Sequence, residues 1–135
     1  MPKSPLQVTC AIIVREGKVL AAQRSATMKH PLKWEFPGGK IEAGETAEAC
    51  IVREIREELN VDVQVLSTVP SHSFPPVHPR IVLYPFVVEI RQGNIQLAEH
   101  VQVKWCGSGE LKRLDWGGAD VGIMEWAIQH LTLQP

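Results

Sequence analysis

The sequence has no long apolar run and no surplus of charge of one sign. No apolar stretch approaches the roughly 20 residues that cross a bilayer, and the first nine residues, MPKSPLQVT, lack the apolar core of a secretory signal. With 14 basic and 15 acidic residues the formal net charge is −1, which argues against a partner that is a nucleic-acid polymer. We therefore expect a cytoplasmic protein without a membrane partner.

Cysteine is scarce as well. Cys10, Cys50 and Cys106 are widely spaced and form no C-x-x-C pair, which is typical of small buried thiols in a reducing compartment. A zinc site or a reactive thiol is the alternative. The sequence also lacks internal repeats, low-complexity segments and linkers, and its 135 residues suit one domain spanning residues 1–135.

Short β-branched and apolar runs alternate with turns and predict several strands and two helices. The expected strands are Val8–Val14, Val19–Arg24, a short extended piece before Pro37-Gly38-Gly39, Asp62–Val69, Arg80–Ile90, Ile95–Leu97 and Val101–Cys106. Pro85 indicates that its strand is an edge or carries a bulge. Apolar residues at helical spacing predict a closing helix over Asp120–Leu131. This order of elements predicts an α/β or α+β sandwich.

A central helix is predicted to begin after Thr46, a suitable N-cap, with Glu48 in its first turn. Apolar residues recur every four positions on one side and should face the core. They are Ala47, Ile51, Ile55 and Leu59.

Three acids crowd an adjacent side of this helix. Glu54, Glu57 and Glu58 stand at i, i+3 and i+4, so each like-charged pair costs about 0.2–0.5 kcal/mol when exposed. One interpretation is a solvated face in which Arg53 pairs with Glu57. The other is a site for a divalent cation, since hard oxygen ligands suit Mg²⁺ or Mn²⁺.

The surrounding residues favour the second interpretation. From Gly39 to Val61 the sequence resembles the signature of the Nudix hydrolase family, G-x5-E-x7-R-E-U-x-E-E-x-G-U with U apolar, and it departs only at Asn60. The family has Gly there, just past the helix, and Asn is the next-best residue for a left-handed conformation. The segments AIIV…KVLAAQR and KWEFPGGK resemble the MutT branch, and EH…W and DWGGAD resemble its CTP pyrophosphohydrolase members.

The resemblance implies an α/β fold, the Nudix fold, in which a mixed β-sheet lies between α-helices. It also implies a set of metal ligands: Glu54, Glu57, Glu58, the carbonyl of Gly38, and Glu99 as an acid that helps to activate water. Arg53 is expected to orient a carboxylate, Glu45 to support the loop–helix arrangement or a metal, and Lys40 to contact phosphate. A solvated loop acid is the alternative for Glu99.

The implied reaction is hydrolysis of a nucleoside triphosphate to a monophosphate and pyrophosphate, with Mg²⁺ or Mn²⁺ as cofactor and no covalent intermediate. Such an enzyme would clear modified nucleotides from the nucleotide pool and would be a monomer or a weak dimer. Two alternatives are a hydrolase of nucleoside diphosphate sugars or dinucleotides, and a non-catalytic nucleotide-binding module. The second is disfavoured because the chain keeps every acid of the signature.

Base recognition is implied for three further residues. Arg24, Phe36 and Asp120 match positions that line the nucleoside pocket of the branch, although a core role for Phe36 remains the alternative. Arg80, with His78 in the same Pro-rich loop, is expected at ribose or phosphate, or simply at the surface.

The expected base depends on the side chain at position 120, which is Asp. Members specialised for 8-oxoguanine nucleotides have Asn there, which both donates and accepts, whereas an ionised Asp only accepts. The N4 amino group of cytosine can donate to Asp, but the neighbouring N3 is an acceptor unless a proton is shared, and the guanine edge offers two donors. The residues leave cytosine and guanine open, and the resemblance favours (d)CTP and modified or oxidised nucleotides such as 8-oxo-dGTP.

Overall fold

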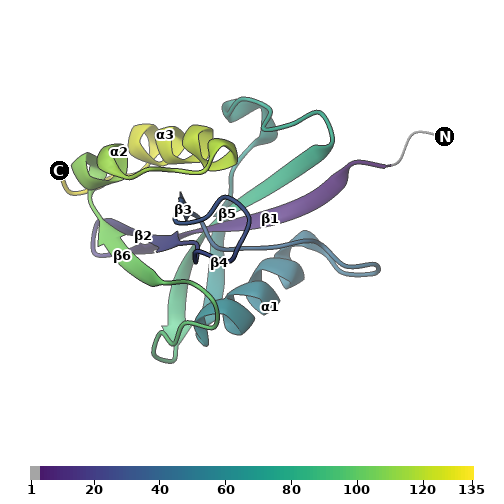
Figure 1. Ribbon diagram of the computed structural model, residues 1–135, viewed down its shortest axis with the longest axis horizontal. Helices are drawn as coiled ribbons and strands as arrows, with labels where there is room; N and C mark the ends of the chain where they lie inside the picture. The colour runs from purple at the N-terminus through teal and green to yellow at the C-terminus, as the bar shows by residue number, and fades with distance from the viewer. Residues whose placement is uncertain (1–3) are drawn as a thin grey trace.

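Strand β1, Leu6–Arg15, runs through a mixed β-sheet in the computed structural model, which describes residues 4–135 (Figure 1). Successive side chains of a strand point to opposite faces, and β1 is apolar on both. Ala11 and Ile13 contribute to the core under one face, and Cys10 and Ile12 to the core under the other. The continuous apolar run of β1 is therefore explained by a strand that is buried on both sides.

The sheet has the order β3-β2-β1-β5-β4, and β6 pairs with β2 beside this path. β1 and β5 are parallel, whereas the other pairs are antiparallel. The remaining strands are β2 (Lys18–Gln23), β3 (Trp34–Glu35), β4 (Asp62–Thr68), β5 (Ile81–Gln92) and β6 (Gln102–Cys106).

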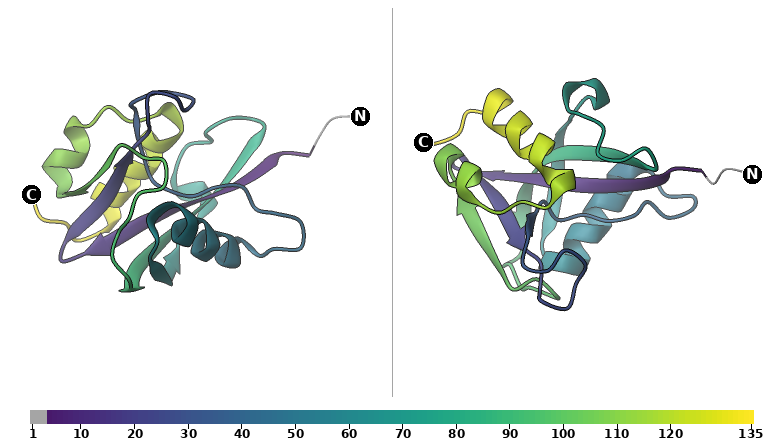
Figure 2. Two further views of the ribbon diagram at one scale, coloured as in Figure 1. Left: turned by 60° about the horizontal axis from the view of Figure 1, so that its bottom comes forward. Right: turned by 45° about the horizontal axis from the view of Figure 1, so that its top comes forward.

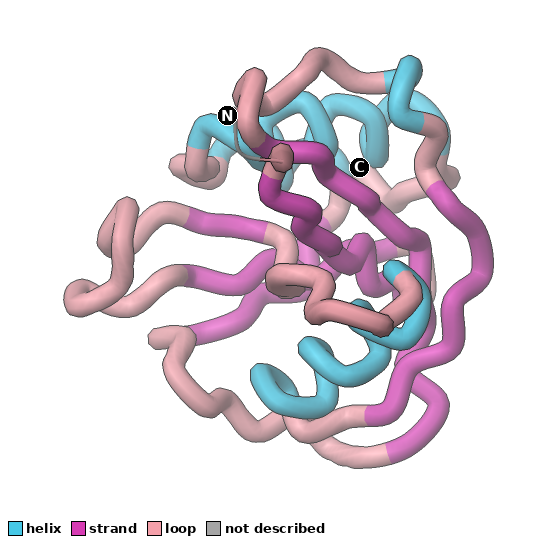
Figure 3. Tube along the Cα trace, turned by 90° about the vertical axis from the view of Figure 1, so that its right-hand side faces the viewer, coloured by secondary structure: helices cyan, strands magenta, loops and turns pink. Residues whose placement is uncertain are grey.

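Helices cover both faces. α1, Ala47–Leu59, packs under one face, while α2, Ser108–Arg113, and α3, Val121–His130, lie over the other, as all three ribbon views show (Figures 1 and 2). Two short 3₁₀ turns, Ser71–Ser73 and Gly118–Asp120, complete the elements. Figure 3 shows the layers edge-on, with strands between the helices. The expected mixed sheet between α-helices is confirmed.

The central helix forms as its sequence predicts. Thr46 caps it by accepting a hydrogen bond from the backbone N–H of Ala49 at 3.1 Å. Ile51, Ile55 and Leu59 are fully buried, and each contributes about 1.5–3 kcal/mol by leaving water. Asn60 ends the helix in the left-handed conformation, at φ 60°, so it replaces glycine there without a change of backbone.

Two expectations were wrong, and a third was right in part. Ile95–Leu97 belongs to no strand, because this segment hydrogen-bonds to the end of α1 instead of to the sheet. The strand that contains Pro85 is no edge, since it lies between β1 and β4, but the expected bulge has support because its pairing with β4 shifts register between Asp62 and Val63 and between Val65 and Ser67. The short helix α2 was not foreseen, since its six residues are too few to show an apolar period.

Cys10, Cys50 and Cys106 are all buried and form no disulfide, as expected of small core thiols. Within residues 4–135, no helix combines the length and the apolar character needed to cross a bilayer.

Candidate active site

A pocket of about 280 Å³ lies beside the C-terminal half of α1. Its lining combines carboxylates from the helix, Met28 from the loop between β2 and β3, and residues of the loop between β5 and β6. The lining residues are Met28, Glu54, Glu57, Glu58, Ala98, Glu99 and His100. The pocket thus brings Glu99 to the three helix acids. Glu57 has a side chain that is 59% exposed, whereas Glu54 is only 17% exposed, so a solvated helix face describes Glu57 alone.

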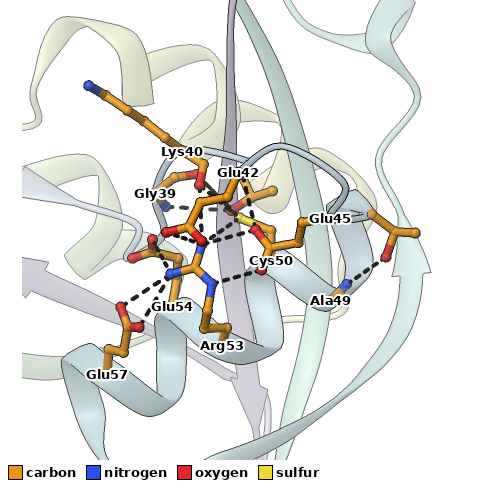
Figure 4. Close-up of polar contacts among 11 residues, drawn as sticks. Gly39, Lys40, Glu42, Glu45, Ala49, Cys50, Arg53, Glu54 and Glu57 are labelled. Carbon is orange, nitrogen blue, oxygen red and sulfur yellow. Dashed lines mark hydrogen bonds and ion pairs between the residues drawn. The ribbon is translucent and has the colours of Figure 1, made fainter.

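Arg53 lies at the centre of a network of charged hydrogen bonds (Figure 4). It donates to Glu45 from Nε at 2.7 Å and from Nη2 at 3.0 Å, to Glu54 at 3.0 Å and to Glu57 at 3.3 Å. These bonds lower the pKa of Glu45 to about 2, chiefly through Arg53, and raise the pKa of Arg53 above its ordinary value. Arg53 therefore holds two pocket acids in place and ties them to the preceding loop.

Glu45 lies outside the pocket lining. Its Oε1 accepts a hydrogen bond from the backbone N–H of Glu42 in the loop at 3.1 Å, and both of its oxygens accept hydrogen bonds from Arg53 of α1. In this arrangement Glu45 joins the loop before α1 to the helix itself.

Gly38 and Gly39 lie where no side chain fits. A Cβ on Gly38 would stand 2.1 Å from the carbonyl oxygen of Thr9, and one on Gly39 would stand 2.4 Å from the carboxylate carbon of Glu54. The backbone of Gly39 pairs with Thr9 in both directions, at 2.8 and 3.1 Å. The two glycines therefore allow the loop to lie directly against β1 and the acids of α1.

Lys40 contributes its backbone to this loop. Its carbonyl oxygen accepts hydrogen bonds from Arg53 Nη2 and from the thiol of Cys50, both at 3.3 Å. Figure 4 shows its ammonium group extending away from Glu54 and Glu57.

Glu58 has the least favourable surroundings of the pocket acids. Burial raises its pKa to about 9, and the charges of Glu54 and Glu35 add to the shift, while the backbone N–H of Gly38 opposes it. Within residues 4–135 its Oε2 is buried and accepts no hydrogen bond. A buried carboxylate oxygen without a donor, in a pocket rich in oxygen ligands, fits a hard divalent cation.

The segment before Glu99 explains how this acid reaches the pocket. The backbone N–H groups of Gln96 and Ala98 donate to the carbonyls of Leu59 and Glu58, at 2.9 and 3.2 Å. Carbonyls at the end of a helix have no partner within it, so the loop supplies their donors. The segment predicted as a strand instead docks on α1 and carries Glu99 with it.

Glu35 was not foreseen as a site residue, yet it links two parts of the site. Its Oε1 accepts a hydrogen bond from Arg24 Nη1 at 2.6 Å, and its Oε2 lies 2.7 Å from Nε2 of His100. Burial by itself would raise the pKa of Glu35, but the hydrogen bonds with His100 and Arg24 hold it below its ordinary value. A single acid in a short strand shows no periodic pattern, so Glu35 can be recognised as a site residue only from its hydrogen-bond partners in the structure.

Asp120 is joined to Phe36, the residue that follows Glu35 in the chain. The backbone N–H of Phe36 donates to Asp120 Oδ1 at 3.4 Å. Burial raises the pKa of Asp120 to about 7, helped by the charge of Glu35. Phe36 is 3% exposed and stacks on Trp116 with ring centroids 4.7 Å apart, so the structure gives it a place in the core.

Arg80 lies apart from the lining of the acid pocket. It is exposed, and its backbone N–H donates to Nδ1 of His78 at 3.0 Å. Its carbonyl accepts a hydrogen bond from the N–H of Leu6 at the start of β1. Arg24, Phe36 and Asp120 are thus brought together around Glu35, whereas Arg80 lies beside the start of the β1–β5 pair.

Comparison with known proteins identifies the family. The family model described as NUDIX domain matches residues 3–127. The chain is 38% identical over 121 residues to the CTP pyrophosphohydrolase of Escherichia coli, covering 89% of each chain. It is 40% identical over 92 residues to the 8-oxo-dGTP diphosphatase of Escherichia coli, covering 66% of this chain and 70% of that one.

A solved structure is similar over nearly the whole length. The solution structure of the E. coli ORF135 protein superposes with a TM-score of 0.75 at 32% identity, covering 93% of this chain and 90% of that one.

Proposed function

The chain belongs to the Nudix family and is a Nudix hydrolase, and from that premise we propose that it hydrolyses nucleoside triphosphates to nucleoside monophosphates and pyrophosphate. The observation that carries the proposal is the pocket in which Glu54, Glu57, Glu58 and Glu99 meet. So many carboxylates suit divalent cations and the polyphosphate whose charge these cations neutralise.

The residues of the pocket have distinct tasks in this proposal. Glu54, Glu57 and Glu58 hold Mg²⁺ or Mn²⁺ together with the Gly38 carbonyl and Glu99. When bound, the cation supplies positive charge for the phosphate oxygens and makes a water molecule more acidic. Arg53 keeps Glu54 and Glu57 in position through its hydrogen bonds. Glu99 is our candidate for the group that accepts the proton of the attacking water.

The nucleoside is proposed to bind near Arg24, Phe36 and Asp120, with Lys40 and Arg80 contacting phosphate or ribose. Support comes from the chain of contacts through Glu35, which connects Arg24 to His100 in the acid pocket. A base held there would leave its polyphosphate directed toward the carboxylates. The reaction then depends on positioning and on electrostatic stabilisation.

The state of Asp120 supports (d)CTP and 8-oxo-dGTP as substrates. With a pKa of about 7, a large fraction of the carboxyl is neutral at neutral pH and has one donor and one acceptor. This pair complements N3 and N4 of cytosine, and equally O6 and N7–H of 8-oxoguanine. An ionised Asp120 offers two acceptors and fits the two donors of the guanine edge.

A substrate panel in Mg²⁺ tests the proposal. We expect pyrophosphate release from dCTP, CTP and 8-oxo-dGTP, and slower release from dGTP. Monophosphate production from ADP-ribose or a dinucleotide, without pyrophosphate release from any triphosphate, would assign the chain to the other class of Nudix substrates. Nucleotide binding without any turnover would indicate a non-catalytic module.

We also propose that residues 1–135 act as one domain and as a monomer or weak dimer. Sedimentation at several protein concentrations tests the oligomeric state.

A further inference from the structure

An imidazole lies among the carboxylates of the acid pocket. His100 lines the pocket together with Glu58, and the residue is only 6% exposed. One ligand-type atom from each of Glu35, Glu58 and His100 lies within 4.8 Å of the other two. Two of these residues, Glu35 and His100, have no task in holding the cation of the proposed hydrolysis.

The spacing of these three atoms suits a single ion bound by all of them. Ligands at about 2.1 Å from an octahedral cation stand about 3 Å apart when adjacent and about 4.2 Å apart when opposite. The observed spread of up to 4.8 Å closes to these values with small side-chain movements. The 2.7 Å contact between His100 Nε2 and Glu35 Oε2 would open by only a few tenths of an ångström.

Two buried atoms at this place lack partners. Among residues 4–135, the buried side-chain oxygen and nitrogen atoms without a hydrogen bond are Glu58 Oε2 and His100 Nδ1. An unsatisfied buried polar atom costs about 1–3 kcal/mol, so a cation that engages Glu58 Oε2 would remove part of this penalty. Both residues border the pocket, which gives an ion a path to them.

We propose that Glu35, Glu58 and His100 form a second divalent-cation position, which selects a first-row transition ion such as Mn²⁺ or Zn²⁺ over Mg²⁺. The imidazole is the selective element, because nitrogen ligands suit transition ions whereas Mg²⁺ prefers oxygen. Glu58, with two carboxylate oxygens, belongs to both positions. This site goes beyond the proposed function, since it binds its ion without nucleotide.

Pulsed electron paramagnetic resonance of the full chain with Mn²⁺, without nucleotide, tests the ligand directly. A coordinated imidazole nitrogen modulates the electron spin echo, and ¹⁵N-labelled histidine alters the modulation. We expect this nitrogen signal in the wild type, its loss in His100→Gln and its retention in His130→Gln. His130 is an exposed histidine at the end of α3 and serves as the matched control.

Zinc affinity gives a second measurement. We expect Zn²⁺ binding by calorimetry to weaken at least tenfold in His100→Gln and in Glu35→Gln, and to be unchanged in His130→Gln. Absence of the nitrogen signal in the wild type would overturn the proposal even if a variant failed to fold, and would leave His100 as a residue that positions Glu35 and Arg24. Pyrophosphate release in Mg²⁺, measured separately, reports on the proposed function alone.

Discussion

Arg53 donates hydrogen bonds to both carboxylate oxygens of Glu45, from Nε at 2.7 Å and from Nη2 at 3.0 Å. Paired charged bonds of this kind fix geometry as well as adding stability. Here they join the loop that carries Gly38 and Gly39 to the helix that carries the pocket acids. The relative position of backbone and carboxylates therefore depends on this contact.

Acidification should weaken this contact in a defined range of pH. The pKa of Glu45 is depressed from its ordinary value of 4.5 to about 2. The stabilisation is therefore complete above about pH 4.5 and is lost as the pH falls toward 2. The melting temperature of the wild type should fall more steeply over this range than that of Glu45→Gln. Glu48→Gln, at an exposed position of the first turn of α1, is the control and should follow the wild type.

Glu57→Gln should separate catalysis from folding. The substitution keeps the shape of the side chain but removes a charged ligand, so turnover should fall by about 100-fold or more while the melting temperature changes little. Glu48→Gln should keep wild-type turnover. Equal rates in both variants would mean that the acids form only a solvated surface.

Divalent cations should stabilise the folded protein. An ion that binds only the folded state at 100 times its Kd adds about 2.7 kcal/mol to the free energy of unfolding. Melting curves in EDTA and in millimolar Mg²⁺ measure this gain, and hydrolysis should stop in EDTA. Turnover that survives chelation would contradict the assignment of the pocket to a metal.

Base preference should change with pH through Asp120. As the pH rises from 6 to 8, through the pKa of about 7, the neutral donor–acceptor form falls roughly tenfold. The ionised form, which fits dGTP, rises roughly tenfold over the same range, so the ratio of kcat/KM for dCTP to that for dGTP should fall by up to about 100-fold.

Asp120→Asn provides the comparison, because its amide keeps one donor and one acceptor at every pH. In this variant the ratio of kcat/KM for dCTP to that for dGTP should not change with pH, and 8-oxo-dGTP should remain a substrate. A mismatched polar contact in a closed pocket costs about 1–3 kcal/mol, so dGTP should lose roughly 5- to 150-fold. A parallel pH dependence in the two proteins would place Asp120 outside base recognition.

The acids of α1 were predictable because their spacing is local. A helix places residues three and four apart side by side, so the sequence alone gathers Glu54, Glu57 and Glu58, and Arg53 is their neighbour in the chain. Thr46 and Asn60 could likewise be assigned as caps, since capping depends on residues within one turn.

Contacts between distant segments could not be predicted in this way. Glu35 becomes recognisable only through Arg24 and through His100, which lies 65 residues away. The segment Ile95–Leu97 has an apolar alternation that suits a strand, but the unpaired carbonyls at the end of α1 bind it. Whether such a segment joins the sheet depends on hydrogen bonds between distant parts of the chain, and the local sequence pattern carries no information about these bonds.

Strand β1 supplies alternate side chains to the cores on both faces of the sheet. Removal of β1 from the sheet would disrupt both cores at once. Unfolding should therefore be cooperative across the whole chain, with no stable half. The amide protons of β1 should exchange with solvent only through global unfolding.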